Sequence, residues 1–152
     1  MPNPRPSLHR LAPEAMKAVL AVEEVVRGEL DRRLLELVKL RASIVNGCAF
    51  CLDLHLRDLL EHGEDVRRVG AVAAWRESPF FTEAERAALA LTDAVTAIGE
   101  HGVPDDVWAA AVAAHGERTV AHLVVAIGLI NLWNRTAIAT HQAPPPLAEA
   151  AA

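Results

Sequence analysis

The 152-residue sequence has no tyrosine, and aromatic residues make up only 4% of it. Aromatic residues are enriched in sheets, so their scarcity, together with an abundance of alanine, leucine and valine, favours helices. Hydrophobic residues make up 52% of the chain, which is enough to build a core at this length. We therefore expect a single-domain, all-α fold.

Basic residues are also comparatively few. The chain has 15 Lys and Arg and 20 Asp and Glu, which gives a formal net charge of −5. Nucleic-acid-binding proteins normally present a basic face, so nucleic acid is not expected as a partner. The longest apolar stretch, residues 120–133, is shorter than the roughly 20 residues of a membrane span. The proline-rich first six residues have no apolar signal-peptide core. We expect no membrane partner and a cytoplasmic location.

The chain divides into three parts by composition. Residues 1–12 are interrupted by prolines and predict a flexible arm, while the Pro/Ala-rich residues 143–152 predict a disordered tail. Between them, residues 13–142 predict a bundle of about six to seven helices. From the apolar periodicity and the turn signals, these helices are expected at about 13–27, 30–45, 48–62, 64–75, 83–98, 104–115 and 117–140. Thr82 and Glu85 fit a capping box before the fifth of them.

Cysteine occurs only twice, at Cys48 and Cys51, and a pair three residues apart excludes a disulfide framework. If a helix begins at Cys48, the two sulfurs lie one turn apart and His55 lies on the same face. A redox dithiol needs one thiolate to attack, a second thiol to resolve the product, and a base. The helix N-terminus favours a thiolate at Cys48, whereas the histidine spacing favours Cys51.

Two other interpretations of the pair remain open. Two thiolates and an imidazole are also zinc ligands, but a fourth ligand would have to come from elsewhere, because the chain has no further cysteine. The cysteines can also be inert residues of the core. We favour the redox interpretation, for which no metal and no cofactor is expected.

The region around the cysteines resembles the AhpD-like alkylhydroperoxidases of the carboxymuconolactone decarboxylase superfamily. The likeness extends over residues 15–140, and it is carried by residues 36–43, residues 46–51, His55 and residues 130–135. It implies an all-α homotrimer or hexamer with a thiol-dependent peroxidase or disulfide reductase activity, without flavin or haem. The implied partners are a hydroperoxide or another small oxidant, and an external thiol or dithiol as reductant.

The resemblance also assigns roles to four residues. In the mechanism of the family, Cys51 reacts with the hydroperoxide and Cys48 resolves the product, while His55 and Glu36 form a proton relay. This chain has Phe50 where the best-known peroxidase members have a histidine, which favours an organic oxidant. The alternatives are a non-redox superfamily member acting on a small lactone or quinone-like compound, and an oligomeric module whose cysteines hold zinc or merely pack.

Simpler roles compete with these at each position. Glu36 lies one turn before Lys39 and can form an ordinary ion pair, and His55 lies on an apolar stripe where a core histidine would also lie. His122 lies on one face of the apolar last helix with Leu129 and Trp133, where a pocket or interface role is the less favoured alternative. Three polar residues of the apolar last helix, Asn131, Asn134 and Arg135, are expected to be architectural, with partners in other subunits. The remaining histidines are expected in helix caps or in the arm, and they are His62, His101, His115, His141 and His9.

Overall fold

The structure, a computed structural model, describes residues 5–147. Among these residues there are eight α-helices and no strand, which confirms the all-α prediction. The helices are α1 (Leu8–Leu11), α2 (Pro13–Glu29), α3 (Arg32–Asn46), α4 (Ala49–Glu61), α5 (Val66–Ala71) with the 3₁₀ turn η1 (Val72–Ala74), α6 (Glu83–Thr96), α7 (Asp105–His115) and α8 (Glu117–Ala139).

The seven helices expected from periodicity correspond to α2–α8, with ends that agree to within a few residues. The capping box before α6 is present, because the Thr82 hydroxyl accepts from the Glu85 amide and the Glu85 carboxylate accepts from the Thr82 amide. The short helix α1 was not expected, since it lies within the segment predicted to be a flexible arm. Residues 1–4 of that arm and residues 148–152 of the predicted tail lie outside the described part of the chain.

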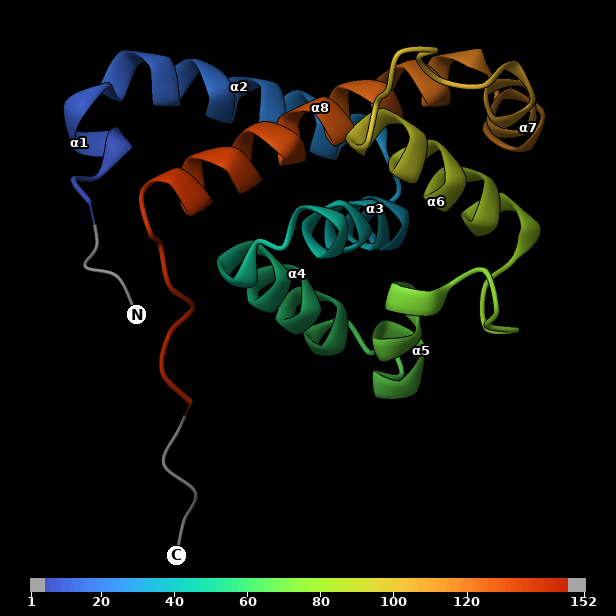
Figure 1. Ribbon diagram of the computed structural model, residues 1–152, viewed down its shortest axis with the longest axis horizontal. Helices are drawn as coiled ribbons and strands as arrows, with labels where there is room; N and C mark the ends of the chain where they lie inside the picture. Colours follow the sequence, from blue (N-terminus) through green and yellow to red (C-terminus); the bar gives the residue numbers. More distant parts are fainter. Residues whose placement is uncertain (1–4, 148–152) are drawn as a thin grey trace, which may run out of the picture.

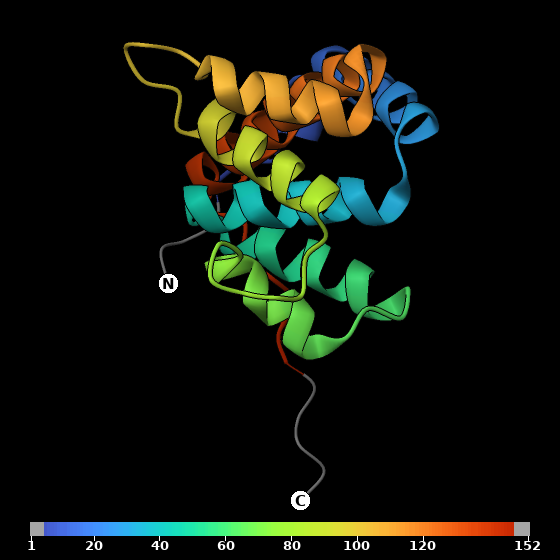
Figure 2. The same cartoon turned by 90° about the vertical axis from the view of Figure 1, so that its right-hand side faces the viewer.

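The helix α3 lies in the middle of the bundle. It packs against α4, α6 and α8, while α2 runs alongside α8. Figures 1 and 2 show the result, in which α2 and α8 cover one side of α3 and α4 covers another. The functional residues predicted on α3 and α4 therefore lie at a junction that α2 and α8 also reach.

The helix α8 supplies much of the core. By length and composition it is the one helix among residues 5–147 that could cross a membrane. However, Leu123, Ala126 and Ile127 have no exposed surface and pack in one cluster with Val26 of α2 and Val38 of α3. One face of α8 is therefore in the core, whereas Val125, Leu132 and Ile138 are 47%, 38% and 45% exposed.

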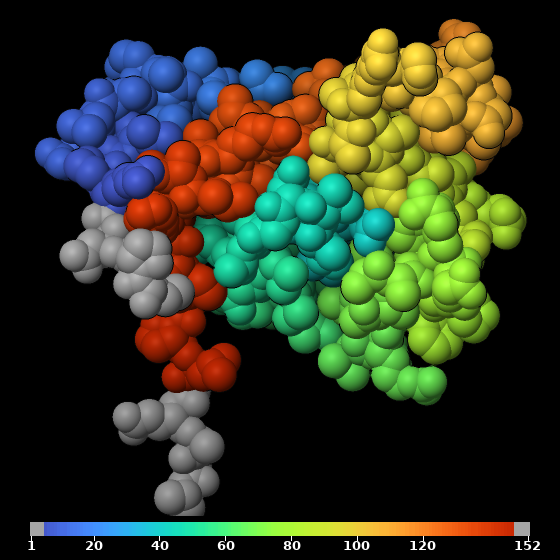
Figure 3. Space-filling view, in the orientation of Figure 1, coloured from blue at the N-terminus to red at the C-terminus, as the bar shows by residue number. Residues whose placement is uncertain are grey.

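The two ends of the described chain meet beside α8. The Arg5 amide donates to the Thr140 carbonyl at 3.0 Å, just past the end of α8. Figure 3 shows the blue N-terminal segment lying against the red C-terminal end of this helix. Residues 143–147 form neither helix nor strand.

Candidate active site

A tight turn between α3 and α4 places the two cysteines. Gly47 has φ = 68° and ψ = 31°, a left-handed conformation that glycine adopts without the steric cost of a Cβ atom. The amides of Gly47 and Cys48 donate to the carbonyls of Ile44 and Ser43, and these bonds close the end of α3. The chain reverses there, and Cys48 becomes the N-cap of α4.

The two sulfurs lie within reach of each other. The Sγ atoms of Cys48 and Cys51 are 2.7 Å apart, and Cys48 Sγ also accepts from the Cys51 amide at 3.4 Å. Both cysteines are free and buried, with exposed fractions of 1% and 3%. A disulfide bond measures about 2.05 Å, so only a small movement is needed to join them.

Each cysteine changes the pKa of the other. The hydrogen bond that the Cys51 thiol donates to Cys48 lowers the pKa of Cys48 to about 6 against the opposing effect of burial, with further help from backbone amides and Asn134. The same bond and burial raise the pKa of Cys51. The thiolate therefore forms on Cys48 at the N-terminus of α4, where the helix dipole also favours a negative charge.

Glu36 and His55 are brought together by the packing of α4 on α3. His55 Nδ1 donates to Glu36 Oε2 at 2.6 Å, and both side chains are buried. A carboxylate only accepts, so the proton of the neutral ring lies on Nδ1 and Nε2 is left as an acceptor. Burial acts to raise the pKa of Glu36, but the hydrogen bond from His55 and the charges of His55 and Lys39 outweigh it and lower that pKa.

Lys39 and Glu23 continue this polar chain, and the sequence reasoning did not assign either of them to the site. Lys39, only 2% exposed, forms ion pairs with Glu23 and, at 3.5 Å, with Glu36. Glu23 also accepts from Trp133 Nε1 at 3.3 Å. Glu36 thus has both the ion pair expected of a structural residue and the histidine contact expected of a relay.

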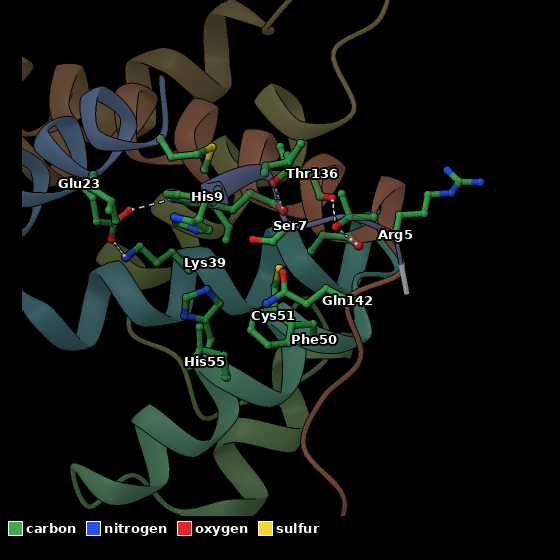
Figure 4. Close-up of a pocket in the computed structure, with 18 of the residues that line it drawn as sticks. Arg5, Ser7, His9, Glu23, Lys39, Phe50, Cys51, His55, Thr136 and Gln142 are labelled. Atoms are coloured by element: carbon green, nitrogen blue, oxygen red, sulfur yellow. Dashed lines mark hydrogen bonds and ion pairs between the residues drawn. The ribbon is translucent and has the colours of Figure 1, made fainter. Parts of the chain in front are cut away.

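A cavity of about 500 Å³ lies next to this cluster. Its walls come from α2, α3, α4, α8 and the N-terminal segment, and both Cys51 and His55 line it (Figure 4). Phe50, Leu54, Ile130 and Trp133 make it largely apolar. Cys48 does not line the cavity, so an oxidant that enters would meet Cys51 first.

The buried asparagines of α8 find partners inside the chain, and the expectation of partners in other subunits is wrong. Asn46 donates to the side-chain oxygens of both Asn131 and Asn134 at 2.9 Å, and Asn134 donates to Ser43 Oγ at 3.0 Å. Arg135 also bonds to Asn131. These bonds fix the turn before Cys48 against α8, which is a structural role.

Most of the other histidines have structural contacts. His62 and His122 bond to carbonyls one turn earlier in their own helices, and His115 bonds to the Ala84 carbonyl of α6. His122 does not line the cavity, so the alternative of a pocket role is not supported. His101 lies in an exposed loop after α6, so the prediction that it caps a helix is wrong.

His9 was expected in a flexible arm, but it lies in the helix α1. It lines the cavity, and its ring lies 6.3 Å from the Trp133 ring, centroid to centroid, with 11° between the planes. Among residues 5–147, no group of three or more His, Cys, Asp or Glu side chains is arranged to hold a metal ion. The zinc interpretation of the cysteine pair therefore finds no third donor in this part of the chain.

Comparison with known proteins shows relatives of the whole chain. It is 38% identical over 136 residues to the uncharacterised protein YdfG of Bacillus subtilis, covering 89% of this chain and 92% of YdfG. It is 33% identical over 110 residues to the uncharacterised protein YnjA of Escherichia coli, covering 72% of this chain and 59% of YnjA.

Solved structures show the same fold. A protein of unknown function from Agrobacterium tumefaciens, provisionally described as the antioxidant defence protein AhpD, superposes with a TM-score of 0.91 and 42% identity, covering 95% of this chain and all of that one. The debrominase Bmp8 superposes with a TM-score of 0.77 over 88% of this chain and 72% of its own, but at 19% identity this shows the fold alone. The carboxymuconolactone decarboxylase family profile matches residues 13–94. With this match and these relatives, the chain belongs to the carboxymuconolactone decarboxylase family, as an AhpD-like member.

Proposed function

We propose that this protein is a thiol-dependent peroxidase that reduces an organic hydroperoxide through a Cys48–Cys51 dithiol–disulfide cycle. The observation that carries the proposal is the place of Cys51, which lines the cavity while its sulfur lies 2.7 Å from that of Cys48. The sulfur that an oxidant meets first therefore has a resolving partner already in reach.

The first step is attack by Cys51. Because the pKa of Cys51 is raised, this thiol needs a base, and His55 lies one turn further along the same face of α4 with Nε2 free to accept. The Cys51 proton moves to His55, whose imidazolium is stabilised by Glu36. The Cys51 sulfur then forms a bond to the terminal peroxide oxygen, the O–O bond breaks, and His55 returns the proton to the departing alkoxide. The products are a sulfenic acid on Cys51 and an alcohol.

The second step is resolution by Cys48. In the reduced pair its pKa of about 6 means that this sulfur is ionised at neutral pH before the oxidant arrives, so the thiolate attacks the Cys51 sulfenic acid without a further base. A disulfide forms, and hydroxide leaves and takes up one proton to become water. The sequence favoured a thiolate at Cys48, because of the helix N-terminus, and also at Cys51, because of the spacing to His55. Both agree with this mechanism, in which Cys51 attacks the peroxide and Cys48 resolves the sulfenic acid.

The third step returns the pair to the dithiol. An external thiol or dithiol supplies two electrons and two protons to the disulfide. Such a cycle suits a reducing compartment such as the cytoplasm, and the four residues that carry it are Cys51, Cys48, His55 and Glu36. No metal or organic cofactor takes part in any of these steps.

The test is the intact mass of the reduced protein after one equivalent of cumene hydroperoxide, followed by alkylation. The wild-type chain is expected to lose the mass of about two hydrogens and both alkylation sites together. In Cys48→Ser, Cys51 is expected to stop at a sulfenic acid that dimedone traps, and in Cys51→Ser, Cys48 is expected to stay reduced. Two free thiols in the treated wild-type protein would overturn the proposal, and a trapped sulfenic acid on Cys48 would reverse the two roles.

A further inference from the structure

The N-terminal segment, residues 5–12 with the short helix α1, forms part of the cavity that opens on Cys51. Arg5, Ser7, Leu8 and His9 all line this cavity. In Figure 4, Ser7 is drawn next to Cys51, and His9 lies above Lys39 and His55. The part of the chain expected to be a free arm is therefore a wall of the proposed oxidant site.

Contacts with α8 hold this wall in place. The Arg5 amide donates to the Thr140 carbonyl at 3.0 Å, and Arg5 Nη1 donates to the Ala139 carbonyl at 2.8 Å. Carbonyls at the end of a helix have no partner within the helix, so Arg5 satisfies groups that would otherwise need water. The stacked rings of His9 and Trp133 make a second point of attachment. The same helix thus supplies Trp133 to the cavity and fixes the segment above it.

The N-terminal segment contributes little to the core. The helix α1 buries none of its four residues, and its N-cap residue Ser7 makes no side-chain capping bond. Leu11 is 60% exposed. The family profile begins only at residue 13. Substitutions in this segment therefore change the cavity with little effect on the folding of the domain.

The dimensions and lining of the cavity indicate what the wall touches. A volume of about 500 Å³ suits a small organic molecule, whereas hydrogen peroxide would occupy a small fraction of it. If the peroxide group lies at Cys51, the organic part of the oxidant extends between Phe50 and Trp133 towards Leu8 and His9, all of which line the same space. Hydrogen peroxide has no organic part to place against these residues.

We propose that the N-terminal segment is the specificity-determining wall of the oxidant site, with Ser7 and His9 contacting the organic part of a compact, apolar hydroperoxide. The inference rests on the proposed peroxidase function. It assigns to residues 5–12 the selection of the oxidant and leaves the chemistry to Cys51 and Cys48.

The test compares two oxidants on full-length variants. Second-order rate constants for the loss of free thiols are measured with cumene hydroperoxide and with hydrogen peroxide, so that no reductant is needed. Ser7→Phe fills the cavity and is expected to slow the reaction with cumene hydroperoxide about tenfold, and His9→Ala about fivefold, because an aromatic contact is lost. Both variants are expected to react with hydrogen peroxide within about twofold of the wild-type rate, because hydrogen peroxide has no organic part for the wall to contact. Leu11→Ala, an exposed position of α1 that does not line the cavity, is the matched control and is expected to change neither rate.

A binding measurement separates the inference from the proposed function. Titration calorimetry with 2-phenyl-2-propanol, the alcohol formed from cumene hydroperoxide, is expected to give weaker binding to Ser7→Phe and His9→Ala than to the wild-type chain and to Leu11→Ala. If the wild-type thiols react with neither oxidant, the proposed function fails, and the calorimetric result alone decides whether residues 5–12 form a binding wall. If the thiols react but both variants keep the wild-type ratio of the two rates and the wild-type affinity, the wall inference is wrong and the function stands.

Discussion

His55 Nδ1 lies 2.6 Å from Glu36 Oε2, although 19 residues separate the two in the sequence. The contact fixes which ring nitrogen carries the proton and leaves Nε2 as the acceptor of a ring that lines the same cavity as Cys51. In the proposed mechanism, the carboxylate stabilises the imidazolium that forms when His55 takes the Cys51 proton.

Removing the charge of Glu36 tests this relationship. Glu36→Gln keeps an acceptor for Nδ1 but loses the negative charge, so we expect the rate of thiol oxidation by cumene hydroperoxide to fall on the order of 10- to 100-fold. Stopped-flow measurement of thiol loss gives this rate. Glu24→Gln, on the exposed side of α2, is the control and should leave the rate unchanged. An equal rate in both variants would remove Glu36 from the mechanism.

The low pKa of Cys48 gives a prediction about pH. Because its pKa is about 6, the thiolate fraction of Cys48 rises as the pH increases through 6, and it is lost below that pH. The main cause is the hydrogen bond from the Cys51 side chain, so Cys51→Ser, which keeps a donor, should preserve the low pKa. Cys51→Ala, which has no donor, should raise it. Thiolate absorbance in the ultraviolet as a function of pH measures both, and coincident titration curves would show that the Cys51 side chain is not the cause.

Lys39 gives a prediction about stability. This buried ammonium lies between Glu23 and Glu36, so Lys39→Met removes the one buried lysine or arginine side chain among residues 5–147 that both carboxylates contact. We expect the free energy of unfolding to fall by about 3–5 kcal/mol. The double variant Glu23→Gln, Lys39→Met should lose less than the sum of the single variants, because one unpaired carboxylate is removed with the cation. Urea denaturation measures these values, and strict additivity would show that the two residues do not interact.

Arg27 serves as the comparison for Lys39. It also pairs with Glu23, but its side chain is 63% exposed. An exposed ion pair contributes about 1 kcal/mol or less, so Arg27→Gln should be close to neutral.

The turn at Gly47 gives a prediction about geometry. A Cβ atom at Gly47 or at Gly63 would meet no other atom within 4 Å, and both residues have positive φ, 68° and 82°. Either change to alanine should therefore cost about 1–2 kcal/mol of backbone strain. Only Gly47 precedes the cysteine pair, so Gly47→Ala should also slow disulfide formation, while Gly63→Ala should not. Denaturation and thiol oxidation measured on both variants separate the two effects, and equal oxidation rates would show that the turn does not position the sulfurs.

The helices could be predicted well because their signals are local. Apolar periodicity and the Thr82 capping box each act within a few residues, and the structure contains both. The common face of Cys51 and His55 follows from helical spacing in the same way. The pairing of Glu36 with His55 depends on how α4 packs on α3, and the resemblance to a known family, more than the spacing, indicated it.

The remaining parts of the site depend on contacts between helices that no local pattern specifies. Glu23 reaches Lys39 only because α2 crosses α3 and α8, and His9 reaches Trp133 only because the N-terminal segment folds back along α8. Asn131 and Asn134 were recognised as polar residues that need partners. The sequence could not show that Asn46, 85 residues before Asn131, supplies them within the chain.

The separation of the N-terminal segment from the buried core also bears on how this site can evolve. A substitution among residues 5–12 meets little packing constraint, since α1 buries no residue, while a change near Cys48 would disturb hydrogen bonds that hold α3, α4 and α8 together. On the proposed function, new oxidant preferences can therefore arise by drift in the eight residues 5–12, with Cys48, Cys51 and His55 left intact. The same separation is useful for laboratory selection. A library of substitutions confined to residues 5–12 would change the oxidant that is preferred, with little loss of folding stability.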